Sequence, residues 1–577
     1  MTARVHSFVL QGIDGVPCEI EADISPIGMP KTTLVGLPDA AVKESAERVR
    51  TAVLNSGFHW PHGRITINLA PADLRKEGPV YDLPLAIAML LAAGTIARTP
   101  REDSKAAHSP GVRSGALAPS GSSPLEGDTP DAASSWPEAL AAQRRSAPAT
   151  NAATAPPPPA RPRPDPDEWL IAGELALDGR VRPIRGVISL SMLAARQKRR
   201  GVIVPAANAA EAAVVEGVEV LIANSLNEVV GYFNGITELA RQDTMDIGVL
   251  IAAAQAELDF ADIRGQEAAK RAMTIAAAGG HNIVMIGPAG TGKTMMARAL
   301  PGILPSLERD EALEVTRIYS AIAALPRDQP VIARRPVRTP HHTASVAAIV
   351  GGGSTPRPGE VSLAHRGVLF LDELPEFSRL ALEALREPLE DGHITIARAH
   401  GAVRFPARVM LVAAMNPTQQ GGGRVDDVSR DPRERYLSRL SGPLIDRIDL
   451  HVEVIAVPFR QLASERRGTS SEVMRERVLA SRAIQLARQS GRCNAELSGR
   501  QLDRIAALDH DSRELLGRAM ADLGLSARAY DKIRRVARTI ADLDGRPAIR
   551  PDDVAEAVQY RLLDRKRCCL LYTSPSP

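Results

Sequence analysis

The stretch that decides the fold lies in the middle of the chain and reads Asn282-Ile283-Val284-Met285-Ile286-Gly287-Pro288-Ala289-Gly290-Thr291-Gly292-Lys293-Thr294. Its second half fits the phosphate-loop pattern G-x-x-x-x-G-K-[ST]. The apolar run before the loop predicts a strand, and residues Met295–Leu300 predict a helix directly after it. Glycines allow the backbone N–H groups of such a loop to surround phosphate oxygens at a helix N-terminus. The sequence therefore predicts an α/β nucleotide-binding core.

Each part of this loop has an expected role. Lys293 would reach the β- and γ-phosphates, and the Thr294 hydroxyl would bind Mg²⁺. The expected nucleotide-binding residues are Gly287, Pro288, Ala289, Gly290, Thr291, Gly292, Lys293 and Thr294. A glycine-rich turn without a ligand is the alternative, and the strand–loop–helix context argues against it.

Two carboxylates end a second apolar run, Gly367-Val368-Leu369-Phe370-Leu371-Asp372-Glu373. A strand beside the phosphate loop would bring Asp372 to the Mg²⁺ and would let Glu373 polarise the attacking water. Many strands end in acidic residues, so the run alone indicates little. Because it follows a phosphate loop, it favours nucleotide hydrolysis over static binding.

A third apolar run, residues 409–415, ends in Asn416. An amide at this point could orient the water against the γ-phosphate. An asparagine that caps the turn before Pro417 is the alternative, but the two preceding motifs favour the functional role.

Two arginines complete the expected catalytic set. Arg447 lies in Leu444-Ile445-Asp446-Arg447-Ile448-Asp449 and could serve a neighbouring subunit as an arginine finger. Arg528 follows Ser526-Ala527 and could contact the γ-phosphate from a lid. The alternative for both is a surface arginine paired with a nearby aspartate.

Composition excludes several classes of protein. The 577 residues carry 71 basic and 68 acidic side chains, so no global charge field points to a partner. The 8 Phe, 7 Tyr and 3 Trp are too few for a long base-stacking platform. Four cysteines form no metal or disulfide framework, which favours a reducing compartment. No secretory signal is visible, and the apolar segment 83–93 is too short to span a bilayer. We therefore expect a cytoplasmic protein with no membrane partner.

Outside the core, composition changes along the chain. Residues 100–166 hold 14 of the 44 prolines and few large apolar side chains, which is typical of a disordered insertion. The blocks on either side, with strands expected at 65–69 and 201–205 and helices after Asp39 and at 187–196, read as one α+β domain. Residues 472–566 read as helical.

The order of these motifs resembles the AAA+ ATPases of the magnesium-chelatase-like class, and in particular the YifB/ComM family. Further segments resemble the family, namely Asp259–Gln266, Thr339–Thr343, Ser362–Gly367, Gly36–Asp39 and Asp82–Pro84. The resemblance implies ATP and Mg²⁺ as cofactors and a homo-oligomer, a hexameric ring with its sites between subunits. It also implies a motor that acts on single-stranded or branched DNA, a branch-migration helicase of recombination or natural transformation.

The expected fold class is α/β, with an AAA+ phosphate-loop core and a helical carboxyl-terminal lid, preceded by an α+β Lon-protease-like domain. The expected divisions are the two parts of the Lon-protease-like domain (1–97 and 167–235), the insertion (98–166), a linker (236–258), the ATPase core (259–455), a helical connector (456–495), the lid (496–566) and a non-family tail (567–577).

Three functions compete. For a DNA motor, two short strands around residues 393–404 could place Arg398, His400 and Arg404 in a ring pore, although an ordinary exposed hairpin fits equally well. A metal-chelatase motor that remodels a protein partner would use the same core, but the amino-terminal domain argues against it. A Lon-type peptidase would need a Ser–Lys pair. In this sequence Val80 stands at the expected serine position, and the expected lysine position falls near Ile188. His341 and His342 are expected to support the core by hydrogen bonding.

Overall fold

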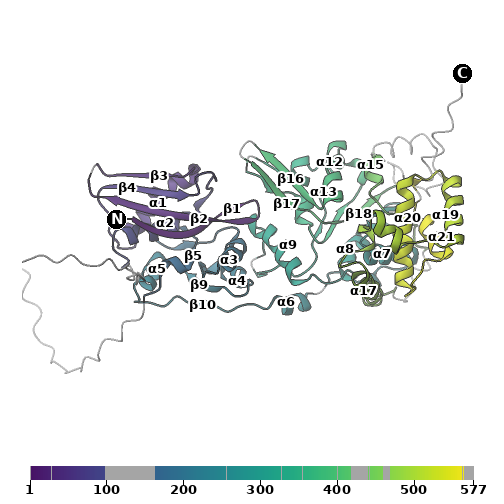
Figure 1. Ribbon diagram of the computed structural model, residues 1–577, viewed down its shortest axis with the longest axis horizontal. Coiled ribbons are helices and arrows are strands. Elements are labelled where there is room, and N and C mark those ends of the chain that lie inside the picture. Colours follow the sequence, from purple (N-terminus) through teal and green to yellow (C-terminus); the bar gives the residue numbers. More distant parts are fainter. Residues whose placement is uncertain are drawn as a thin grey trace, which may run out of the picture.

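The computed structural model describes residues 2–27, 29–97, 163–254, 256–326, 328–353, 355–398, 401–417, 440, 442–458, 468–561 and 563–564. The predicted insertion lies outside these residues except for its last four, and the predicted tail lies wholly outside them. Figure 1 shows an elongated molecule, with the amino-terminal sheet at one end, the core that carries the phosphate loop in the middle and the carboxyl-terminal helices at the other end.

The amino-terminal part is built on an eight-stranded sheet with the order β10-β9-β8-β5-β1-β2-β4-β3. β1 pairs in parallel with β5 at His6 and Leu170, so segments from both sides of the insertion form one sheet. The strands are β1 (Thr2–Gln11), β2 (Asp14–Ser25), β3 (Lys31–Val35), β4 (Arg64–Ala70), β5 (Trp169–Ile171), β8 (Gly201–Pro205), β9 (Glu219–Ala223) and β10 (Arg241–Gln242), with β6 (Glu174–Leu175) and β7 (Val181–Arg182) in a separate pair.

Helices cover this sheet. They are α1 (Ala40–Asn55), α2 (Asp82–Ala92), α3 (Val187–Arg196), α4 (Ala206–Ala212), α5 (Leu226–Phe233) and, in the connection to the core, α6 (Ile247–Ala253). The carboxylate of Asp39 accepts a hydrogen bond from the Val42 N–H at 2.7 Å, which caps α1 as its sequence predicts. Every residue of α2 is buried, so the apolar segment is a core helix. Within the described residues, no helix combines the length and the apolar composition needed to cross a membrane.

The core is a five-stranded sheet in the order β12-β15-β18-β11-β19, and every neighbouring pair is parallel. The strands are β11 (Ile283–Ile286), β12 (Val337–Arg338), β15 (Val368–Leu371), β18 (Met410–Met415) and β19 (Leu450–Glu453). Alternate residues of the strands pack into two different apolar clusters, one on each face. This explains why the strands are apolar throughout rather than alternating.

Helices and two hairpins surround this sheet. The helices are α7 (Glu267–Gly279), α8 (Lys293–Ala299), α9 (Arg309–Ala321), α10 (Val346–Val350), α11 (Glu360–Leu363), α12 (Arg379–Ala384), α13 (Arg386–Asp391) and α15 (Gly442–Ile445). The hairpins pair β13 (Gly351–Gly352) with β14 (Arg357–Pro358), and β16 (His393–Arg398) with β17 (Gly401–Pro406). The second hairpin confirms the two strands predicted around residues 393–404, although residues 399 and 400 lie outside the described part.

The carboxyl-terminal helices are α17 (Ser471–Arg488), α18 (Gly499–Ile505), α19 (His510–Leu523), α20 (Ala527–Leu543) and α21 (Pro551–Gln559). They share one apolar cluster with α7 and with alternate residues of the core sheet. α20 lies at the edge of the sheet where the strands begin, because His281, just before β11, is 2.8 Å from the Thr539 hydroxyl. This contact places Thr539 of α20 at the end of the sheet opposite to the one where the strands end.

Candidate nucleotide site

The phosphate loop connects the end of β11 to the start of α8. A Cβ at Gly287 would come within 2.1 Å of the Val454 carbonyl oxygen, so only glycine fits there. Gly290 and Gly292 have φ angles of 78° and 88°, which favour glycine, and no atom lies near where their Cβ would be. The side-chain amide of Gln266 holds the loop in place. It donates hydrogen bonds to the carbonyl of Thr291 in the loop at 3.2 Å and to the carbonyl of Ile455 after β19 at 2.7 Å. Gly290 and Gly292 thus leave open space beside the loop backbone, as a phosphate-binding loop requires.

Lys293 is held inside this loop. Its side-chain ammonium donates to the Gly287 and Pro288 carbonyl oxygens, each at 2.7 Å, and lies 3.3 Å from Asn416 Oδ1. The residue is only 7% exposed. Burial lowers the pKa of Lys293, and the nearby Asp372 carboxylate partly opposes that shift. A buried cation that faces the loop fits a polyphosphate ligand.

The two expected magnesium ligands touch each other. Thr294 Oγ1 donates to Asp372 Oδ2 at 3.0 Å, from the first turn of α8 to the residue after β15. A hydroxyl and a carboxylate are the hard oxygen ligands that Mg²⁺ prefers. The residues present therefore fit a magnesium ion bound between α8 and the end of β15.

Glu373 adopts an unusual backbone conformation directly after Asp372. Its φ is 52°, and its N–H donates to Asp372 Oδ1 at 3.0 Å. Such conformations in non-glycine residues are costly and cluster at functional sites. The Glu373 carboxylate, 51% exposed, lies 3.2 Å from His342 Nδ1. The rings of His341 and His342 are tilted by 32° with their centroids 4.2 Å apart, so both histidines lie near this acidic residue.

The strand register explains why these groups meet. Ile286 pairs with Met415, and Leu371 pairs with Ala413, so Gly287, Asp372 and Asn416 all follow neighbouring strand ends. The structure thus brings Lys293, Thr294, Asp372, Glu373 and Asn416 to one edge of the sheet.

Arg447 lies at the opposite end of the parallel strands, where they begin. Its carbonyl accepts a hydrogen bond at 3.0 Å from the Asn282 side chain, directly before β11 begins. Its side chain is 12% exposed and pairs with Glu390 of α13. Since β11 has four residues, the two edges are separated by roughly 13 Å at about 3.3 Å per residue. The structure does not bring Arg447 to the phosphate loop of its own chain.

Arg528 lies beside Arg447 rather than beside the loop. Its guanidinium is 72% exposed and pairs with Asp446 at 3.0 Å. One turn later on α20, Lys532 donates to Asp449 at 2.7 Å. Burial works against the charge on Asp449, but Lys532 and His281 outweigh it and hold the pKa of that carboxyl well below its usual range. This buried group fixes α20, and with it Arg528, to the amino edge of the sheet. The structure therefore does not bring Arg528 to the phosphate loop of its own chain, and the expected contact of Arg528 with a γ-phosphate stays a prediction.

The sequence reasoning missed the supporting contacts of four residues: Gln266 with the phosphate loop, Asp446 with Arg528, Glu390 with Arg447, and His342 with Glu373. The first three are ordinary polar residues whose partners are far away in the chain, so no local pattern identifies them.

The peptidase alternative finds no nucleophile where it was expected. Val80 packs against the apolar cluster that contains Ile188. Val80 and Ile188 are both aliphatic, so these two positions supply neither the serine hydroxyl nor the lysine amine of such a pair.

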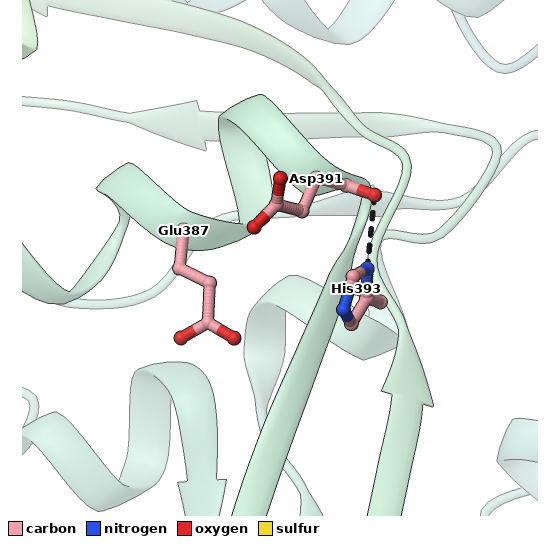
Figure 2. A group of neighbouring side chains, drawn as sticks. All are labelled: Glu387, Asp391 and His393. Atoms are coloured by element: carbon pink, nitrogen blue, oxygen red, sulfur yellow. Dashed lines mark hydrogen bonds between the residues drawn. The ribbon is translucent and has the colours of Figure 1, made fainter.

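One other group of metal-type side chains lies within the described residues. Glu387, Asp391 and His393 approach one another at the base of the β16–β17 hairpin (Figure 2). The Arg404 guanidinium lies 2.8 Å from His393 Nδ1, so a cation bound there would meet a positive charge. We assign no metal to this group.

Comparison with known proteins places these features in a family. A family model described as magnesium chelatase, subunit ChlI, matches residues 259–462, and its carboxyl-terminal counterpart matches residues 468–561. A third, described as subunit ChlI of Mg-chelatase, matches residues 20–107 and 159–208.

Individual proteins that match over nearly their full length give the same result as the family models. The chain is 40% identical to the uncharacterized protein YifB of Salmonella typhimurium, over 98% of this chain and 97% of that protein. It is 39% identical to the competence protein ComM of Haemophilus influenzae, over 98% of both chains. The magnesium-chelatase subunit ChlI of Nicotiana tabacum is 24% identical, over 38% of this chain and 47% of its own. With its phosphate loop, its parallel sheet and this near full-length similarity, the chain belongs to the YifB/ComM family of magnesium-chelatase-like AAA+ ATPases.

Proposed function

We propose that the protein is an ATP-hydrolysing motor that acts on DNA, assembled as a ring, most simply a hexamer, in the cytoplasm. The single observation that carries the proposal is the separation of the catalytic groups. Lys293, Asp372 and Glu373 lie at one edge of the sheet, while Arg447 and Arg528 lie at the other. One subunit can supply both sets only to two different sites, which is the arrangement of a ring with head-to-tail contacts.

Each residue then has a role at the interface. Lys293 and the loop N–H groups bind the phosphates of ATP, and Thr294 with Asp372 would hold Mg²⁺, which neutralises charge on the phosphate oxygens. Glu373 orients and deprotonates the attacking water, and Asn416 contacts the γ-phosphate. Arg447 and Arg528 come from the neighbouring subunit, where their positive charge stabilises the transferring phosphoryl group.

The family and the β16–β17 hairpin support DNA as the substrate. Ile394, Ile396 and Phe405 are buried under the hairpin, whereas Thr395 and Arg404 point away from the core. An exposed arginine on such a hairpin suits the phosphate backbone. Arg398 and His400 lie outside the residues whose side chains are described. The resemblance to the YifB/ComM family implies that the motor drives branch migration in recombination or natural transformation.

A direct test measures ATP turnover by the purified protein with no nucleic acid, with a single-stranded oligonucleotide and with a four-way DNA junction. We expect the junction to stimulate turnover most and to be resolved by branch migration. Turnover that no DNA changes would argue against a DNA motor.

A second function has its own support, because the matching family models are all described by the chelatase subunit ChlI. The alternative is a chelatase-type motor that remodels a protein partner. Turnover stimulated by a porphyrin-metallating partner, and by no DNA, would favour that alternative.

A further inference from the structure

Arg447 is held within its own subunit by an acidic residue. The Arg447 guanidinium forms an ion pair with Glu390, which lies on α13 and is 60% exposed. Only 12% of the Arg447 side chain is exposed. An arginine that must reach a neighbouring subunit is thus restrained while this pair is intact.

The partner of Arg447 is joined to the β16–β17 hairpin. α13 ends at Asp391, and Gly392 is the one residue between it and β16. The Asp391 carbonyl lies 3.0 Å from His393 Nδ1, and the Gly392 carbonyl accepts from the Ala407 N–H at 2.8 Å. Figure 2 shows α13 running directly into the base of the hairpin.

The base of the hairpin is closely packed where it meets α13. Arg404, on β17, lies 2.8 Å from the His393 ring on β16. A Cβ at Gly392 would come within 2.8 Å of the Arg408 side chain, so the connection is tightly packed. A displacement of the hairpin would therefore displace α13 and Glu390.

From this juxtaposition we infer that Glu390 is a positioning residue that restrains Arg447 until the β16–β17 hairpin moves. When DNA engages the hairpin, α13 shifts, the Glu390–Arg447 pair opens, and Arg447 extends into the neighbouring site. The inference rests on the proposed function, in which Arg447 acts on the next subunit. It adds a route by which DNA contact at the hairpin raises hydrolysis at the adjacent site.

The test compares Glu390→Gln with the matched control Glu387→Gln in the full-length protein. Glu387 lies one turn earlier on the same helix and is also exposed. ATP turnover is measured without nucleic acid and with a single-stranded oligonucleotide, together with the melting temperature and the assembly state. We expect Glu390→Gln to raise the DNA-free rate roughly two- to fivefold, as for one partly exposed ion pair, and to reduce the stimulation by DNA to the same extent. Glu387→Gln should behave like the wild type.

Two further variants separate the restraint from a structural effect. Glu390→Asp, which keeps the charge, should restore much of the stimulation by DNA. Arg447→Ala should be equally inactive with and without Glu390→Gln, because the restraint has nothing left to act on. A DNA-free rate that Glu390→Gln leaves unchanged, or lowers, would overturn the inference.

These outcomes differ from a failure of the proposed function. If Arg447→Ala keeps full turnover, the role of Arg447 in the neighbouring site is wrong. If DNA stimulates no turnover in the wild type, the DNA motor is wrong, while the DNA-free rate of Glu390→Gln still tests the restraint.

Discussion

Two inactive variants should restore activity to each other when they assemble in one ring. Glu373→Gln removes the group that activates water, and Arg447→Ala removes the cation expected from the neighbouring subunit. The two residues lie at opposite edges of a sheet whose central strand, β11, spans four residues, or roughly 13 Å at about 3.3 Å per residue. An interface between an Arg447→Ala subunit, which keeps Glu373, and a Glu373→Gln neighbour, which keeps Arg447, is therefore complete.

The size of the recovery follows from this geometry. Removing an arginine finger costs about 10³- to 10⁵-fold in turnover, so Arg447→Ala alone should be almost inactive. Glu373→Gln alone should also be almost inactive, because it lacks the carboxylate that activates the water. In a ring with one head-to-tail interface per subunit, random assembly of equal amounts makes about one quarter of the interfaces complete. Turnover should thus return to about one quarter of the wild-type value if the sites act independently.

The assay is steady-state ATP hydrolysis by rings isolated after co-expression of the two variants with different affinity tags. Purification on both tags in succession ensures that every ring measured contains both variants. Rings that mix wild-type subunits carrying the same two tags serve as the control for full activity. Doubly tagged rings that are as inactive as either variant alone would refute the trans placement of Arg447.

Three other perturbations test the site and the fold. Lys293→Ala should abolish ATP turnover, and Glu373→Gln should keep ATP bound, which filter binding of labelled nucleotide would measure. Asp82→Ala should lower the free energy of unfolding by about 3 kcal/mol, because the buried Asp82 accepts from Arg48 at 2.5 and 3.0 Å and from the Leu175 N–H; urea denaturation measures the loss. A hydrogen bond from His365, together with Arg366, lowers the pKa of Glu314 from 4.5 to about 2. Because the folded-state pKa is depressed, this carboxylate stabilises the fold above its unfolded pKa and ceases to do so as the pH falls toward 2. The difference in melting temperature between the wild type and Glu314→Gln should therefore shrink over that interval.

Local patterns predicted the elements that hold the nucleotide site. The apolar run before the phosphate loop is β11, the run before Asp372 is β15, and the run before Asn416 is β18. Outside the core, the expected helix at 187–196 is α3 and the expected strand at 201–205 is β8, with the same bounds. These segments are predictable because parallel strands buried on both faces are apolar throughout, and because apolar residues recur at a fixed spacing along an amphipathic helix.

The local sequence around Arg447 and Arg528 could not predict where in the fold these two arginines lie. The segments around Arg447 and Arg528 predict their neighbours in the chain but not the edge of the sheet at which they lie. That edge is decided by the register of β19 on β11 and by the contact of Lys532 with Asp449, which joins residues 83 positions apart. The pairing of Glu390 with Arg447 is equally long-range, and an acidic residue on a short surface helix has nothing in its local sequence to indicate a partner.

The turn of residues 446–449 connects three parts of the molecule that a motor must coordinate. Asp446 pairs with Arg528 of α20, Arg447 pairs with Glu390 next to the hairpin, and Asp449 is fixed by Lys532 and His281. Asp449 is buried and is held by both Lys532 and His281, so the turn stays fixed to the sheet. The pairs at Asp446 and Arg447 each have one partner that is more than half exposed, so we expect them to be weaker and able to exchange partners. The turn thus carries one arginine, Arg447, and contacts a second, Arg528, through Asp446, and we expect both ion pairs to be able to change without any change in the sheet. If the proposed coupling between neighbouring sites exists, we expect it to involve these ion pairs rather than the central strands, which are buried on both faces.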